Sequence, residues 1–147
     1  MIHAEGAVTI KRPVNEVYNF LLDGNNNKCW RPAVLDISKI ADTPEGVGAQ
    51  YKQVCVKGPG GGHFNADYEI VDAQPEKLIR FKVISGPARP TGTFKMRAEG
   101  KTTQLIFLLD YEPRNFVEKL MRGIIQRSMN AEIANLANLK GYLEEHK

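Results

Sequence analysis

The sequence predicts a single α+β domain, spanning residues 1–147, in which a curved antiparallel sheet wraps around a long C-terminal helix. Two observations carry this prediction. Short segments of alternating apolar and polar residues recur from residue 2 to residue 111, separated by turns rich in glycine and proline. From residue 115 the apolar residues follow a helical period instead. A chain of 147 residues has the usual size of one domain.

The chain is expected to open with a strand and two short helices. Residues 2–10 alternate in polarity, which predicts a half-buried strand. Pro13 suits the first turn of a helix, because its missing N–H needs no partner there, and residues 14–21 have apolar side chains at helical spacing. We expect Gly24 to end this helix in a left-handed conformation. A second short helix is expected to carry Trp30.

Six further strands are expected after these helices, which gives a seven-stranded sheet. They lie near residues 35–41, 47–56, 63–73, 77–85, 91–99 and 103–111. Their connections are too short for parallel crossovers, so the strands should pair antiparallel through hairpins. The glycine-rich run at 58–62 lacks the Gly-Lys-Ser/Thr of a phosphate-binding loop and predicts a flexible hairpin turn.

The last segment predicts one long amphipathic helix over residues 115–145. Asn115 and Glu118 have the spacing of a capping box, in which the two side chains satisfy backbone N–H groups at the helix start. A helix of this length would extend about 45 Å at roughly 1.5 Å per residue, enough to cross a small sheet. Its apolar side is formed by Val117, Met121, Ile125, Met129, Ile133, Leu136, Leu139 and Leu143.

Composition argues against several classes of protein. The net charge of +3 is small and the basic residues are spread along the chain, so we expect no nucleic-acid binding. Cys29 and Cys55 lack metal-ligand spacing and the histidines are scattered, so we expect reduced thiols, no metal and no other cofactor. No segment has the pattern of a signal peptide or the length of a membrane span, so we expect a cytoplasmic protein without an integral membrane segment.

The inner faces of the predicted strands are rich in aromatic residues, with a few polar tips. This pattern fits either a solid core packed around the long helix or the wall of a ligand pocket. Tyr51 and Tyr68 could present hydroxyls to a ligand or satisfy them internally. Cys55 could act as a nucleophile only beside a base or a positive charge, and is otherwise a small buried hydrophobe.

Two motifs and the order of the elements carry a resemblance to a known family. The opening reads Val8-x-Ile10-x-Arg12-Pro13-Val14-x-Glu16-Val17-Tyr18-x-Phe20-Leu21-x-Asp23, with Trp30 a few residues later. The chain closes with Leu136-x-x-Leu139-Lys140-x-x-Leu143-Glu144. The sequence thus resembles the START-like, or birch-pollen-allergen-like (SRPBCC), superfamily, in its polyketide cyclase/dehydrase and lipid-transport branch. The resemblance covers nearly the whole chain and implies a helix-grip fold with a cavity between the sheet and the long helix.

That resemblance implies a hydrophobic small molecule as the partner, such as a lipid, a polyketide-like compound or an aromatic metabolite. Binding or carrying it is the leading hypothesis. The alternatives are a polyketide cyclase, aromatase or dehydratase, and a protein-interaction module like the co-chaperone or quinone-chaperone relatives. No residue pattern identifies a catalytic group. The side chains expected to contact the ligand are Trp30, Tyr51, Gln53, Cys55, Phe64, Tyr68, Phe81, Phe94, Met96, Phe107, Met121, Ile125 and Met129.

Two surface features leave further partners open. Ile106 and Leu108 fall on the outer face of the last strand, which suggests a homodimer. Basic residues also gather in the first half of the long helix, where they could meet an anionic ligand, a membrane surface, an acidic partner or only solvent. These residues are Arg114, Lys119, Arg122 and Arg127.

Overall fold

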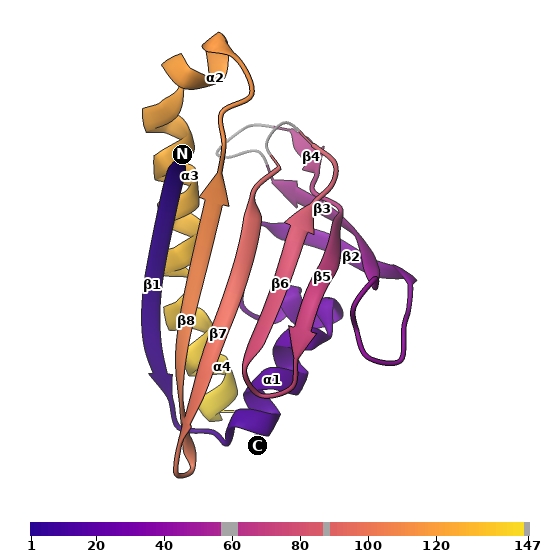
Figure 1. Ribbon diagram of the computed structural model, residues 1–147, viewed down its shortest axis with the longest axis vertical. Helices are drawn as coiled ribbons and strands as arrows, with labels where there is room; N and C mark the ends of the chain where they lie inside the picture. Colours follow the sequence, from indigo (N-terminus) through magenta and orange to yellow (C-terminus); the bar gives the residue numbers. More distant parts are fainter. Residues whose placement is uncertain (57–61, 87–88, 146–147) are drawn as a thin grey trace.

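One antiparallel sheet forms the body of the molecule in the computed structural model, which describes residues 1–56, 62–86 and 89–145 (Figure 1). Within these residues the strand order is β1-β8-β7-β6-β5-β3-β2, and a short strand, β4, pairs with β3 off this path. The strands are β1 (Ile2–Ile10), β2 (Val34–Ala41), β3 (Gln50–Val56), β4 (His63–Asn65), β5 (Tyr68–Gln74), β6 (Leu78–Val83), β7 (Thr91–Glu99) and β8 (Thr102–Tyr111).

This sheet confirms the predicted strands, with one difference. The strand expected at 63–73 is divided into β4 and β5, because the two residues between them leave the extended pairing with β3. The predicted glycine-rich hairpin falls mostly on residues 57–61, which lie outside the described residues.

The helices cover one side of the sheet (Figure 1). Two short ones follow β1, as predicted, and the C-terminal helix confirms the expected α+β architecture. That C-terminal helix is not continuous, because its regular geometry is interrupted at Met121 and Asn135. The helical segments are α1 (Val14–Leu22), the 3-10 helix η1 (Gly24–Cys29), α2 (Phe116–Leu120), α3 (Arg122–Ala134) and α4 (Leu136–Glu145).

The predicted capping box at the start of α2 is half confirmed. The Asn115 side-chain oxygen accepts the backbone N–H of Glu118 at 2.9 Å. The Glu118 carboxylate does not return to Asn115. It accepts the backbone N–H of Arg114 at 2.6 Å and the Tyr111 hydroxyl at 2.8 Å, and so ties the start of α2 to the end of β8.

Gly24 differs from its expected conformation. It is the first residue of η1 and is not among the glycines with positive φ, so it is not a left-handed helix cap. Glycine is needed here because the Gly24 backbone packs closely against two tyrosine side chains. A Cβ at this position would overlap the Tyr68 hydroxyl and approach the Tyr51 ring to 2.9 Å. Glycine therefore allows η1 to lie directly on β3 and β5.

Arg12 joins the first connection of the chain to the last helix. Its guanidinium donates to the backbone carbonyls of Leu143 at 2.7 Å and Glu144 at 3.2 Å. These carbonyls lie in the last turn of α4, where a cation is favoured by the helix dipole. Arg12 thereby fixes the end of α4 beside the start of α1.

The core lies between the helices and one face of the sheet. Along β8, Leu105, Phe107 and Leu109 are buried, whereas the intervening Ile106 is exposed. The same alternation holds on β3, where Tyr51, Gln53 and Cys55 are buried. The inner and outer faces predicted for these two strands are therefore confirmed.

Candidate functional site

Aromatic rings from four adjacent strands form a continuous series inside the fold. The ring centroids of Tyr68 and Phe81 are 5.4 Å apart, those of Phe81 and Phe94 5.9 Å, and those of Phe94 and Phe107 4.5 Å. The antiparallel register places these side chains together, since Phe94 pairs directly with Phe107. The Trp30 ring makes T-shaped contacts with Phe94 and Phe107, with centroids 6.1 and 6.3 Å away.

A small cavity of about 20 Å³ remains beside these rings. This volume is close to that of one water molecule and far below that of a typical ligand pocket. Side chains thus fill most of the interior in this structure, and the space between these residues is smaller than the ligand-sized cavity that the resemblance implied. The cavity is lined by Leu21, Asn27, Trp30, Arg31, Tyr68, Ile70, Ile79, Phe81, Phe94 and Phe107.

Polar groups converge at one end of the cavity. The Asn27 amide donates to the Gln53 side-chain oxygen and to the Tyr68 hydroxyl oxygen, both at 3.1 Å. The Gln53 amide donates in turn to the Ala66 carbonyl at 3.2 Å. Burial raises the pKa of the Tyr68 hydroxyl, because the phenolate would lose its solvation. Tyr68 therefore keeps its proton and can donate it in a hydrogen bond.

Arg31 brings a positive charge to the same end. Burial acts to lower the pKa of its guanidinium, but the Glu132 carboxylate 2.9 Å away outweighs that effect and the pKa is raised. A second guanidinium nitrogen lies 3.4 Å from the Gln53 side-chain oxygen. Burial raises the pKa of the Cys55 thiol, although Arg31 opposes this. Cys55 is thus better described as a small buried hydrophobe than as a nucleophile.

Trp30 is the unusual member of this group. Its side chain is 2% exposed, and its indole N–H finds no hydrogen-bond partner among the described residues. Trp30 also lines a second, open space, a surface groove of about 600 Å³ between η1 and α4. Trp30 therefore belongs to the lining of both the inner cavity and the outer groove. The other groove residues are Lys28, Cys29, Pro32, Ala137, Asn138, Gly141, Tyr142 and Glu145.

Tyr51 faces a different space from the one expected. Its hydroxyl donates to the Leu22 carbonyl at 3.4 Å, and the side chain borders an open surface hollow of about 490 Å³ near the β2–β3 connection. Its ring still stacks on Tyr68, with centroids 5.1 Å apart. Tyr51 therefore packs against the Tyr68 end of the aromatic series, and its hydroxyl bonds to the Leu22 carbonyl and not to a group in the cavity.

The structure brings only some of the expected ligand residues to the cavity. Trp30, Tyr68, Phe81, Phe94 and Phe107 line it. Gln53 joins the adjoining polar network. Met121 is 42% exposed, because the helix is interrupted at this residue and the segment before it turns away from the sheet. The remaining expected residues do not line the cavity, and they are Cys55, Phe64, Met96, Ile125 and Met129.

Two polar cavity residues, Asn27 and Arg31, were missed by sequence reasoning. Asn27 belongs to a run of three asparagines, a composition that is typical of turns. Arg31 precedes a proline and has no periodic pattern around it. Their positions on either side of Trp30, which was expected to contact the ligand, could have indicated both residues.

The described residues contain no group of three or more histidine, cysteine, aspartate or glutamate side chains placed to hold a metal ion. None of the helices in that part of the chain combines the length and apolar character needed to cross a membrane.

Several solved structures share this fold. A START superfamily protein from Mycobacterium smegmatis has a TM-score of 0.80 at 15% identity, with 99% of each chain covered. The Zhui aromatase/cyclase from Streptomyces sp. R1128 has a TM-score of 0.68 at 16% identity, covering 97% of this chain and 91% of its own. The Aha1 dimer from Colwellia psychrerythraea has a TM-score of 0.68 at 19% identity, covering 98% and 97%. At such identities the likeness shows the fold alone.

The fold defines a helix-grip protein, an architecture that the chain shares with the START superfamily protein. The family model described as "Polyketide cyclase / dehydrase and lipid transport" matches residues 1–141, so the chain belongs to that family. No curated protein matches the sequence. Membership supports a ligand-binding or cyclase function and leaves the particular molecule to be argued from the site.

Proposed function

We propose that this protein binds a hydrophobic small molecule in the interior, with a hydrogen-bond-accepting group of the ligand placed at the Trp30 end. The observation that carries the proposal is the buried indole N–H of Trp30, which has no partner among the described residues and lies beside a ring-lined cavity. A buried donor left without a partner costs about 1–3 kcal/mol. A carbonyl or carboxylate oxygen on a ligand would recover that free energy.

The chemistry of the walls favours an aromatic or polyketide-like body for this ligand. Stacked and tilted rings of Tyr68, Phe81, Phe94 and Phe107 offer flat apolar surfaces. The polar end offers the Tyr68 hydroxyl and the charged Arg31 as donors, and the lining also contains Trp30, whose indole N–H has no partner among the described residues. Donors around an apolar chamber suit recognition of a ketone, quinone or carboxylate oxygen.

The cavity must open for such a ligand to enter, and movement of the Trp30 side chain would open it. Trp30 lines both the cavity of about 20 Å³ and the groove of about 600 Å³. Its backbone is held by two hydrogen bonds of 3.3 Å, one to the Asn27 carbonyl and one from the Asn138 amide. Outward rotation of the indole, away from Phe94 and Phe107, would join the two spaces.

The cyclase alternative is less well supported by the geometry. A cyclase acting on a ketone needs a group that accepts a proton and one that donates it near neutral pH. The raised pKa of Tyr68 makes its hydroxyl a hydrogen-bond donor that does not ionise. Glu132 already forms an ion pair with Arg31 at 2.9 Å. Binding without turnover is therefore the function that the cavity supports best.

A displacement titration tests this function. The purified protein is titrated with anilinonaphthalene sulfonate, which fluoresces in apolar surroundings, and the dye is then displaced with naphthoate or with naphthalene. We expect saturable binding, and displacement at lower concentration by naphthoate, because only naphthoate offers an acceptor oxygen. Absence of saturable binding by the folded protein would contradict the proposal.

Two conservative variants locate the binding. Tyr68→Phe removes a hydroxyl at the cavity, and we expect it to weaken naphthoate binding by about tenfold or more, the range of one hydrogen bond to a charged group. Tyr51→Phe is the matched control, because its hydroxyl bonds to the Leu22 carbonyl outside the cavity. Equal effects of both variants, or none from Tyr68→Phe, would show that the ligand binds elsewhere.

A further inference from the structure

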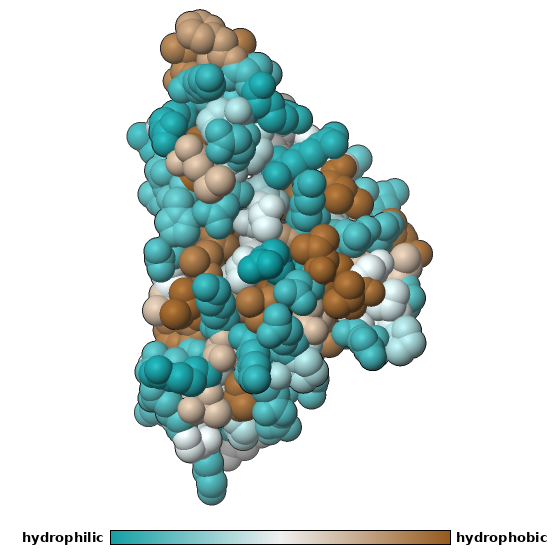
Figure 2. Space-filling model, viewed as in Figure 1, coloured by the Kyte–Doolittle hydropathy of each residue, from teal (hydrophilic) through white to brown (hydrophobic). Residues whose placement is uncertain are grey.

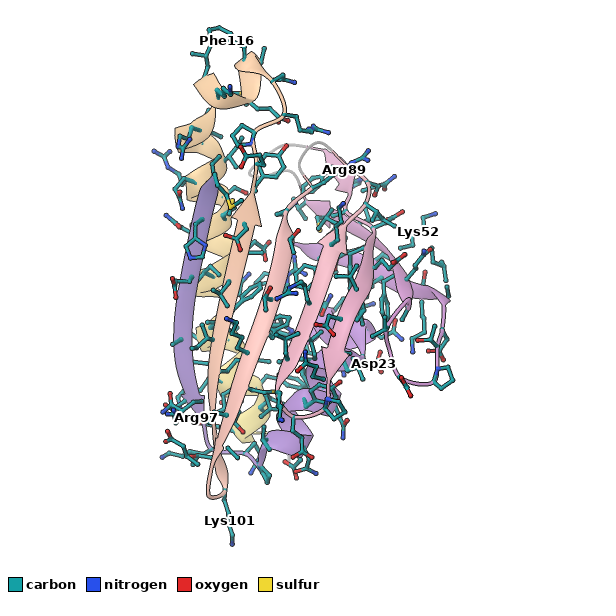
Figure 3. The ribbon with its side chains drawn as sticks, in the orientation of Figure 1. Asp23, Lys52, Arg89, Arg97, Lys101 and Phe116 are labelled. Carbon is teal, nitrogen blue, oxygen red and sulfur yellow. The ribbon has the colours of Figure 1, made fainter. Side chains whose placement is uncertain are left out.

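A cluster of exposed apolar side chains forms one end of the molecule. Phe116 and Leu120 are each 71% exposed, and their neighbours on α2 and the start of α3 are similarly uncovered. Figure 1 shows α2 projecting beyond the ends of β1 and β8, and Figure 3 labels Phe116 at its outermost point. Figure 2 shows apolar atoms at this end. We call it the α2 tip, and it consists of Phe116, Val117, Leu120, Met121 and Ile124.

The spacing of these residues is that of a helix face that normally packs on a core. Val117, Leu120, Met121 and Ile124 stand at positions i, i+3, i+4 and i+7. None of the residues of α2 is buried, however, because the segment lies past the end of the sheet. Contiguous exposed apolar patches on soluble proteins typically mark an interaction site.

The tip is held in place before any partner arrives. The Asn115 side chain caps the N–H of Glu118 at 2.9 Å. The Glu118 carboxylate in turn binds the Tyr111 hydroxyl at 2.8 Å and the Arg114 guanidinium at 2.8 Å. A surface already fixed to the end of β8 loses little conformational entropy when it binds.

The charge around the tip is positive. Residues 113–127 contain four basic side chains and one acidic side chain, a net charge of +3. The acidic one, Glu118, is neutralised by its ion pair with Arg114. Lys119, Arg122 and Arg127 are exposed alongside the apolar residues. A projecting apolar helix with cations beside it matches the interface of an anionic bilayer, in which apolar groups enter the acyl boundary and cations meet the headgroups.

We propose that the α2 tip docks the protein onto anionic lipid membranes, with its apolar residues in the interface and Lys119, Arg122 and Arg127 at the headgroups. Two features favour a bilayer over a second copy of the chain. The tip projects as a convex end, whereas a protein partner would need a complementary hollow. Its positive charge would also repel the same surface on another copy in a symmetric dimer. This proposal is independent of the interior ligand.

Vesicle sedimentation tests it. The full chain is incubated with vesicles of equal parts phosphatidylglycerol and phosphatidylcholine, or with phosphatidylcholine alone, and the pelleted fraction is measured. We expect binding to the anionic vesicles, weakening as salt is added, because salt screens the headgroup attraction. In Phe116→Trp, we expect the added indole to be quenched by brominated lipid, while buried Trp30 is not.

Matched variants separate the tip from the rest of the surface. We expect Leu120→Ser with Ile124→Ser to weaken vesicle binding at least tenfold, and Lys119→Glu about tenfold. The controls are Leu35→Ser with Ile40→Ser, which are exposed on β2, and Lys101→Glu, which lies at the opposite end of the molecule (Figure 3). Circular dichroism verifies the fold of each variant.

Three results would overturn the proposal. One is failure of the wild-type chain to pellet with anionic vesicles. Another is an equal loss of binding in tip and control variants. The third is a dimer by light scattering that the Leu120→Ser, Ile124→Ser pair converts to a monomer, because the tip would then be an interface between copies of this chain.

Discussion

The carboxylate of Glu132 on α3 lies 2.9 Å from the guanidinium of Arg31, which follows η1 and Trp30 in the chain. This ion pair joins the segment that carries Trp30 to the C-terminal helix at the polar end of the interior. Both side chains are largely buried, with 15% and 27% exposure. The pair should therefore stabilise the fold and restrain the segment that carries Trp30.

Glu132→Gln should destabilise the fold, because it leaves the buried Arg31 charge without its counter-ion. We expect a loss of about 2–3 kcal/mol in the free energy of unfolding, measured by urea denaturation, near the lower limit for breaking a buried pair. Glu99→Gln breaks the exposed pair with Arg97 and should leave the free energy of unfolding nearly unchanged, because solvent screens an exposed pair. Similar losses in the two variants would show that burial of Arg31 has no energetic consequence.

Gly24→Ala and Gly141→Ala should have opposite effects. A Cβ on Gly24 overlaps the Tyr68 hydroxyl, so the substitution must displace η1 and is expected to cost about 2 kcal/mol or more. Gly141 lies in α4 with nothing within 4 Å of an added Cβ, so alanine should stabilise the helix by about 0.5–1 kcal/mol. Thermal unfolding of the two variants checks both signs, and a neutral Gly24→Ala would refute the close packing.

The two thiols should differ in reactivity. Cys29 is exposed, whereas Cys55 is buried with its pKa raised by that burial. Because the thiolate is the reactive form, we expect a disulfide reagent to label one thiol quickly in the native protein and the second only after unfolding. Cys29→Ser should abolish the fast reaction. Fast labelling that survives this substitution would mean that the site around Cys55 opens readily.

His3 should make stability depend on pH. Hydrogen bonds to Asp110 at 2.6 Å and then to Glu5 at 3.0 Å raise its pKa above 6.5, since they favour the charged imidazole. The stabilisation is therefore complete below the unfolded-state pKa and is lost as pH rises through the folded-state pKa. It should be small, because the side chain is exposed.

The His3 effect is measured by comparing unfolding temperatures of wild type and His3→Gln. We expect the variant to be less stable at about pH 5 and nearly equal to wild type at about pH 9, in keeping with the unperturbed histidine pKa. A proton NMR titration of His3 should give a midpoint above 6.5. A midpoint at or below that value would contradict the two hydrogen bonds.

Most of the fold could be predicted from local patterns. The alternation of β8 identified which side chains are buried, because a strand with one buried face has a period of two. The break at Met121 could not be predicted, since the apolar spacing continues through it. This continuous spacing predicted that Met121 faces the core. Met121 is exposed instead, because it lies at the end of α2, beyond the sheet.

The site was predicted less completely, because its polar end depends on tertiary contacts. Tyr51 and Tyr68 share the inner face of the sheet, yet their side chains end in different places. The Tyr51 hydroxyl donates to the Leu22 carbonyl, whereas Tyr68 lines the cavity. Strand periodicity gives the face of a residue but not the direction of its tip. The pairing of Arg31 with Glu132 joins residues about a hundred positions apart and leaves no local signal.

The most direct test of interior binding is the indole N–H resonance of Trp30. The chain has one tryptophan, so a proton–nitrogen correlation spectrum contains one indole signal and needs no assignment. During titration with naphthoate we expect this signal to shift downfield and saturate, as the buried N–H gains an acceptor, and Tyr68→Phe should move the midpoint to higher concentration. An indole signal that stays in place while naphthoate binds would contradict the account.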